Sequence, residues 1–133
     1  MTSYLKLYLS SLAAFLLLDM LWLGILARSF YQRHLGYLLA PQTIWLAAIL
    51  FYLLFVAGLI HFVVLPGRSV GSLRHTLVRG AFFGLIAYAT YDLTNLATIR
   101  DWPFILTLVD LAWGTVLSAL VSMVGFWVAR RLG

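Results

Sequence analysis

The sequence predicts an all-α, polytopic membrane protein: a bundle of four transmembrane helices that forms one membrane domain over residues 1–133. Hydrophobic residues make up 64% of the chain and charged residues 10%, a composition that would leave a large apolar surface in water. Four apolar segments each reach the roughly 20 residues that a helix needs to cross a bilayer. None of the four alternates polar and apolar residues as a barrel strand does.

The predicted helices cover residues 4–26, 43–65, 77–99 and 103–128. The second is expected to close at Pro66-Gly67, because proline interrupts the hydrogen bonds of a helix. The fourth begins at Pro103, a favoured residue at the first helical position, and ends before Arg130.

The first segment resembles a signal peptide in its short N-terminal region with Lys6. However, Asp19 and Trp22 interrupt the apolar run, and the run is long enough to span a bilayer. The sequence therefore favours a retained first helix.

Basic residues near the helix ends predict the orientation. One side would hold Lys6, Arg68, Arg74, Arg79, Arg130 and Arg131, and the other Arg28, Arg33 and Arg100. Both termini are therefore expected in the cytoplasm. The net charge of +5 fits this topology signal and contact with anionic headgroups of the lipid bilayer. No nucleic-acid-reading module is recognisable, so no nucleic acid partner is expected.

Three aspartates, Asp19, Asp92 and Asp110, lie inside separate apolar segments. A carboxylate at membrane depth costs several kcal/mol and marks a functional site by default. Counted from the outer helix ends, each lies eight or nine residues deep, which is about 10–13 Å at 1.5 Å per residue. Tyr52 falls at the same depth. The sequence thus predicts one polar layer in the outer half of the bilayer.

Helical spacing of three and four residues predicts that the aspartates face the inside of the bundle. On the third helix they share a stripe with Gly80, Gly84, Tyr88 and Asn95, with Tyr91 adjoining; on the fourth, with Thr107, Gly114, Ser118, Ser122 and Gly125. Trp22, Asn95 and Trp113 each follow an aspartate by three positions and can offer an N–H group. The predicted ligand- or proton-binding residues are Asp19, Asp92, Asp110, Asn95, Tyr52, Tyr88, Tyr91, Trp22, Trp113 and Thr107.

Three motifs carry a family resemblance: Asp19-Met-Leu-Trp22-Leu-Gly24, Tyr91-Asp92-Leu-Thr-Asn95 and Asp110-Leu-Ala-Trp113-Gly114. With them the chain resembles a bacterial family of small four-helix integral membrane proteins that is catalogued as a domain of unknown function. The resemblance implies the fold and a location in the bacterial inner membrane, and it implies no activity.

No cofactor or metal is expected. His34, His61 and His75 lie in different segments without the spacing of a zinc site, and cysteine is absent. A hard cation held by the aspartates and Asn95 is less favoured, because such sites usually need about six oxygen ligands. Nucleotide-binding and hydrolase patterns are missing.

Three functions remain open, and with them the question of whether the protein is an enzyme. The first is binding or transport of a small cationic or amphipathic ligand, or of protons, by a pocket around the aspartates, in a homo-oligomer by analogy with other small transporters. The second is a membrane enzyme that acts on a lipid or isoprenoid by carboxyl acid–base chemistry. The third is an accessory subunit of a larger membrane complex. In a purely structural alternative, the carboxyl groups tie helices together, neutral or paired with Arg28 or Arg100.

Two features are expected at the membrane surface, an aromatic belt and an anchoring loop. Trp45, Trp102 and Trp127 lie near segment ends, as is typical of an interfacial aromatic belt. The loop over residues 30–37 mixes aromatic and basic residues and is interpreted as an interfacial anchor rather than as a lid over the pocket.

Overall fold

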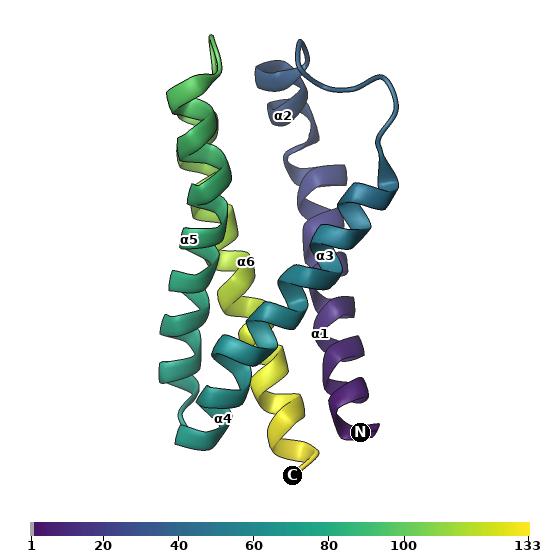
Figure 1. Ribbon diagram of the computed structural model, residues 1–133, viewed down its shortest axis with the longest axis vertical. Coiled ribbons are helices and arrows are strands. Elements are labelled where there is room, and N and C mark those ends of the chain that lie inside the picture. Colours follow the sequence, from purple (N-terminus) through teal and green to yellow (C-terminus); the bar gives the residue numbers. More distant parts are fainter. Residues whose placement is uncertain (1) are drawn as a thin grey trace.

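The computed structural model describes residues 2–133, which form helices and connecting turns with no strand among them (Figure 1). In chain order the elements are α1 (Thr2–Leu21), the π-helical turn η1 (Trp22–Leu26), α2 (Arg28–Leu35), α3 (Trp45–Leu59), the π-helical turn η2 (Ile60–Val64), α4 (Leu65–Val70), α5 (Leu73–Thr98) and α6 (Phe104–Arg131). Because α1 runs on into η1, and α3 through η2 into α4, residues 2–133 form four long rods and one short helix.

Three of the rods are long and apolar enough to cross a membrane by length and composition: Thr2–Leu26, Trp45–Val70 and Phe104–Arg131. The predicted all-α membrane fold is therefore confirmed. The fourth rod, α5, has 26 residues and runs alongside α6 (Figure 1). It carries Arg74, Arg79, Asp92 and Asn95, whose polar side chains make it less apolar than the other three.

The second rod does not close at Pro66-Gly67, so that prediction is wrong. The rod continues to Val70, and Gly71 ends it in the left-handed conformation with a φ of 74°. Pro66 is accommodated because it falls in the first turn of α4, directly after η2. There the N–H of Leu65 bonds to the carbonyl of Ile60, five residues back, and a proline in a first turn needs no hydrogen bond of its own.

Two helix starts also differ from the prediction. The third rod begins at Leu73 rather than at residue 77, because the Ser72 hydroxyl accepts a hydrogen bond from the His75 N–H at 3.1 Å and caps the helix. The last rod begins at Phe104. Pro103 precedes it in an extended conformation and so occupies the N-cap rather than the first helical position.

The antiparallel pair α5 and α6 packs through small residues in a regular register. Three pairs face each other: Gly80 and Ser122, Gly84 and Ser118, and Gly114 and Tyr88. Each step of four residues along α5 therefore matches a step of four back along α6. A Cβ atom on Gly80 would lie 2.8 Å from the Cβ of Ser122, so only glycine permits this approach of the backbones.

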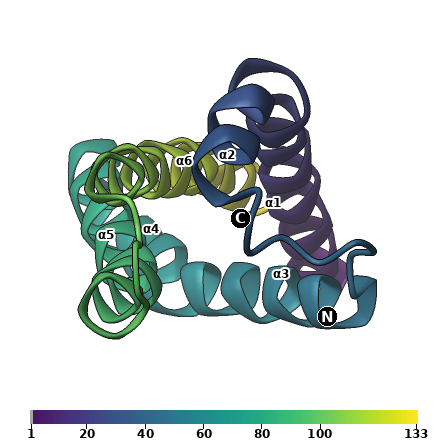
Figure 2. The same cartoon turned by 90° about the horizontal axis from the view of Figure 1, so that it is seen from above.

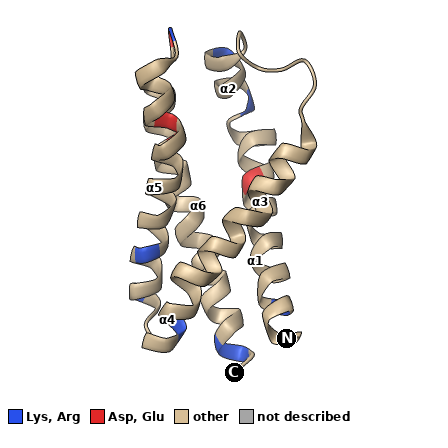
Figure 3. Cartoon of the chain, in the orientation of Figure 1, with Lys and Arg blue, Asp and Glu red and all other residues tan. Residues whose placement is uncertain are grey.

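Both termini lie at one end of the bundle, the terminal end, and α2 lies at the opposite end, the α2 end (Figure 1). More of the Lys and Arg residues lie toward the terminal end than toward the α2 end, and the acidic residues lie in the half next to α2 (Figure 3). The main apolar core contains Phe15, Val56, Leu59, Leu117 and Val121.

A second apolar cluster at the α2 end joins Leu35, Trp102 and Leu106. Trp102 is only 7% exposed, so its interpretation as a belt residue is wrong: the turn after α5 folds its ring inward beneath α2. Trp45 and Trp127 lie on the surface, as expected of belt residues.

Candidate functional site

A cavity of about 370 Å³ lies among the four rods in the half of the bundle next to α2. Its lining residues are Asp19, Leu23, Ala48, Phe51, Tyr52, Ala87, Tyr88, Tyr91, Asp110 and Trp113. Two carboxyl groups and five aromatic rings thus surround a space that is otherwise bounded by aliphatic side chains.

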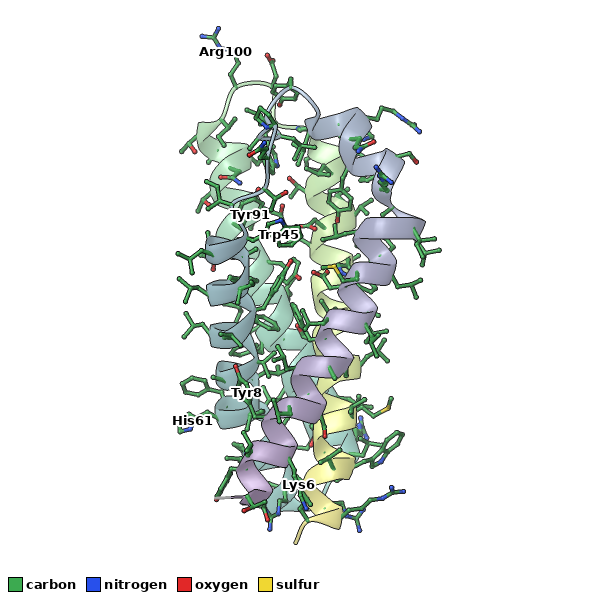
Figure 4. All side chains as sticks on the ribbon, turned by 90° about the vertical axis from the view of Figure 1, so that its right-hand side faces the viewer. Lys6, Tyr8, Trp45, His61, Tyr91 and Arg100 are labelled. Atoms are coloured by element: carbon green, nitrogen blue, oxygen red, sulfur yellow. The ribbon has the colours of Figure 1, made fainter. Side chains whose placement is uncertain are left out.

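The oblique course of α3 creates this space. The second rod meets α5 near the terminal end and diverges from it toward the α2 end (Figure 1). Phe55 of α3 still packs against α5, with its ring centroid 5.5 Å from that of Phe83 and 6.4 Å from that of Tyr88. Beyond it, the lining residues Phe51 and Tyr91 are 46% and 56% exposed. Tyr91 and Trp45 lie at the same height in this half (Figure 4). We infer that the cavity opens sideways, between α3 and α5.

The acid–tryptophan motif of the first rod, Asp19 and Trp22, contacts that of α6, Asp110 and Trp113. Because these rods run antiparallel, Asp19 lies at the level of Trp113, whose indole N–H donates to Asp19 Oδ1 at 3.2 Å. The Trp22 indole N–H donates to the Tyr31 hydroxyl at 3.1 Å, and that hydroxyl donates to Asp110 Oδ1 at 2.6 Å. The two indole rings stack with centroids 4.6 Å apart. Trp113 therefore donates directly to the aspartate of the other helix, whereas Trp22 is connected to Asp110 through the Tyr31 hydroxyl.

Tyr31, on α2, is a polar residue of the site that the sequence did not predict. The helix folds back over the end of the bundle between α1 and α6 (Figure 2), and Leu35 fixes it in the cluster with Trp102. Burial and the neighbouring Asp110 carboxyl raise the pKa of the Tyr31 hydroxyl, so it remains a donor. The segment interpreted as an anchor thus also contributes a hydrogen bond to the acidic site.

Asp92 lies behind the cavity wall. It is fully buried, and neither carboxyl oxygen has a hydrogen-bond donor among the described residues. Continued by one step of four, the α5–α6 register places Asp92 opposite Asp110. The site thus contains a carboxyl pair in addition to Asp19.

Comparison with known families decides the relationship: the family described as Predicted membrane protein (DUF2177) matches residues 4–127. The chain belongs to this family. Neither the comparison with curated proteins nor that with solved structures gave a match. The resemblance noted in the sequence is thereby confirmed.

Six of the ten predicted site residues line the cavity of this DUF2177 protein: Asp19, Tyr52, Tyr88, Tyr91, Asp110 and Trp113. Trp22 and Asp92 lie one layer behind it. Asn95 is half-buried and outside the lining, and the Thr107 hydroxyl accepts a hydrogen bond from the Trp102 indole N–H at 3.1 Å. Leu23, Ala48, Phe51 and Ala87 were not predicted, because an apolar side chain in an apolar segment carries no distinguishing signal.

Asp19 and Asp110 accept hydrogen bonds from Trp113 and Tyr31 rather than from the arginines that the structural alternative proposed. Arg28 and Arg100 are both exposed, and Arg100 points away from the bundle at its tip (Figure 4). The hydrogen-bonding partners of these two aspartates are therefore uncharged.

We predict that Tyr31→Phe loosens α2. The substitution removes one hydrogen bond to Asp110 and leaves the Trp22 N–H without its acceptor; a hydrogen bond to a charged group contributes about 1.5–3 kcal/mol. Amide hydrogen exchange in residues 28–35 is expected to accelerate about tenfold or more. Tyr37→Phe is the control, because its hydroxyl bonds only to the backbone carbonyl of Asp101. Equal exchange rates in the two variants would contradict the role given to Tyr31.

Proposed function

We propose that this membrane protein binds a small amphipathic organic cation in the cavity among α1, α3, α5 and α6. The observation that carries the proposal is the lining itself: the carboxyl groups of Asp19 and Asp110 beside the rings of Phe51, Tyr52, Tyr88, Tyr91 and Trp113. Aromatic faces attract a cation by about 0.5–2 kcal/mol each, more when water is excluded, and the carboxyl groups supply opposite charge. The aliphatic lining suits the apolar part of such a ligand.

The proposed route of entry is sideways from the lipid. The exposed lining residues Phe51 and Tyr91 are aromatic and flank the opening between α3 and α5. An amphipathic cation concentrates at the membrane surface, with its charge among the headgroups and its apolar part in the acyl chains. An opening between α3 and α5 at the boundary of headgroups and acyl chains would admit the cation directly from the lipid.

The proposal includes an orientation in the bacterial inner membrane, with both termini in the cytoplasm and the cavity in the outer half. The larger number of Lys and Arg residues toward the terminal end supports it (Figure 3). Toward the terminal end the cavity is closed by packed aromatic rings, since the ring centroid of Phe15 lies 5.3 Å from those of both Tyr52 and Phe55. Transport across the membrane would require these rings to move, so binding from the outer leaflet is the primary activity proposed.

The test is binding of benzyltrimethylammonium, which combines a permanent positive charge with one ring, to the protein in lipid nanodiscs. We expect saturable binding that is about tenfold weaker or more in Asp19→Asn and in Asp110→Asn, because each loses an opposite charge beside the ligand (~1.4 kcal/mol). Tetramethylammonium, which lacks the ring, is expected to bind less tightly than benzyltrimethylammonium.

Asp101→Asn is the matched control. Asp101 is an exposed aspartate outside the cavity, and its left-handed φ of 60° is a conformation that asparagine also adopts readily. If Asp19→Asn and Asp110→Asn bind the cation as tightly as Asp101→Asn does, the cavity carboxyl groups do not recognise charge and the proposal fails.

A further inference from the structure

Asp92 has no hydrogen-bond partner among the described residues that would explain its burial. Its exposed fraction is 0%, and neither oxygen accepts a hydrogen bond from a described residue. An ionised carboxylate buried without a partner costs several kcal/mol. Asp92 therefore needs a proton or a nearby positive charge.

The neighbour that the fold supplies is a second carboxyl group. The glycine contacts of α5 and α6 advance in matched steps of four, and the next step pairs Asp92 with Asp110. Two adjacent carboxyl groups without a cation between them hold one proton in common, because both cannot ionise at close range at low cost. With that proton, the Asp92 hydroxyl donates to the Asp110 carboxylate, which also accepts from Tyr31.

The other ionisable groups that face this pair from each packed element are acids and phenols. They are Asp19 on α1, Tyr31 on α2, Tyr52 on α3, and Tyr88 and Tyr91 on α5. Within residues 2–133, the cavity lining contains no lysine, arginine or histidine. A positive charge can thus reach the pair only with a ligand.

We propose that the Asp92–Asp110 pair holds one proton while the cavity is free and releases it when a cation binds, which makes the site a proton–cation exchanger. The positive nitrogen takes its position beside the Asp110 carboxylate, which lines the cavity. The O–H bond of Asp92 then breaks and its proton passes to Asp110. From Asp110, which lines the cavity, the proton is released to a water molecule and leaves through the opening, and both carboxyl groups remain ionised. No electrons are transferred, and the net charge of the occupied site equals that of the free site. The exchange step rests on the proposed cation binding, whereas the shared proton does not.

The shared proton is tested without any ligand, by infrared spectroscopy of the protein at neutral pH. A protonated carboxyl group has a carbonyl stretch distinct from that of a carboxylate. We expect this band in the wild type, a loss of intensity in Asp92→Asn, and an unchanged band in Asp101→Asn. Asparagine keeps the shape of a protonated aspartate and offers an N–H donor to Asp110, so the fold is expected to persist. A spectrum of Asp92→Asn equal to the wild type in this region would overturn the shared proton.

The exchange is tested by calorimetric titration with benzyltrimethylammonium in two buffers that differ in ionisation enthalpy. We expect about one proton released per cation bound in the wild type, and an affinity that falls roughly tenfold per unit decrease in pH while the pair is protonated. Asp92→Asn is expected to bind the cation with no proton release and with little dependence on pH.

The outcomes of these experiments distinguish a failure of the proposed cation binding from a failure of the proposed proton exchange. If the wild type binds no cation but shows the carboxyl band, the proposed function fails and the shared proton stands. If the wild type binds the cation and releases no proton, the exchange is overturned while the proposed function stands. The proton count of the wild type decides this even if Asp92→Asn does not fold.

Discussion

Replacing Gly84 with alanine is expected to force α5 and α6 apart and to destabilise the protein by about 1–3 kcal/mol. A Cβ atom at this position would overlap the backbone carbonyl of Gly114 as well as the side chain of Ser118. Because a backbone atom cannot turn aside as a side chain can, the helices themselves must separate. The measurement is unfolding in mixed micelles at increasing mole fractions of sodium dodecyl sulfate, followed by circular dichroism.

Gly24→Ala is the matched control, because no atom of another part of the protein lies within 4 Å of a Cβ built there. We expect this variant to unfold at the same detergent fraction as the wild type. Equal midpoints for Gly84→Ala and Gly24→Ala would show that α5 and α6 do not approach as closely as described, and the pairing of Asp92 with Asp110 would then lose its geometric basis.

Gly114→Ala is expected to abolish most cation binding without altering a charged residue. The new methyl group would overlap the ring of Tyr88, which forms part of the cavity wall. The ring has to swing toward the space that the ligand would occupy, because α6 lies directly behind it. We expect the affinity for benzyltrimethylammonium to fall more than about tenfold (~1.4 kcal/mol), as measured in nanodiscs.

The control for this variant is Gly125→Ala on the same helix. There a Cβ atom would lie 2.9 Å from Val64 and 3.2 Å from Ser11, both in the terminal half and outside the cavity. It is expected to cost stability but to leave binding by the folded protein unchanged. If both variants bind the cation equally well, Tyr88 is not part of the ligand site.

Much of the site can be predicted from local sequence patterns. Counting residues from each helix end predicts one depth for Asp19, Asp92 and Asp110, since the rise per residue of a helix is constant. In the structure Asp19 lies at the level of Trp113, three residues along α6 from Asp110 toward the terminal end. The spacing of three and four residues assigns them to inner faces, and six of the ten predicted residues line the cavity. The register between α5 and α6 also has a local signal, because Gly80 and Gly84 on one helix recur at the same spacing as Ser118 and Ser122 on the other.

Other features depend on how segments meet. The end of the second rod at Gly71 rather than Pro66 depends on the π-helical turn before the proline. The contact from Tyr31 to Asp110 joins residues 79 positions apart and depends on how α2 folds back. Trp102 is adjacent to a helix end, where belt residues are common, yet it is covered by Leu35.

By itself, the sequence determined the membrane-helical class, and it predicted the approximate spans and a common depth for the three aspartates. These follow from composition and from the constant geometry of a helix, which act along a single segment. The tertiary structure alone decided that α3 diverges from α5 toward the α2 end, that Trp113 donates a hydrogen bond to Asp19 on the opposite helix, and that Trp22 reaches Asp110 through Tyr31. Crossing angles and side-chain contacts between helices arise from two helices packing against each other, and no periodicity within one helix contains that information.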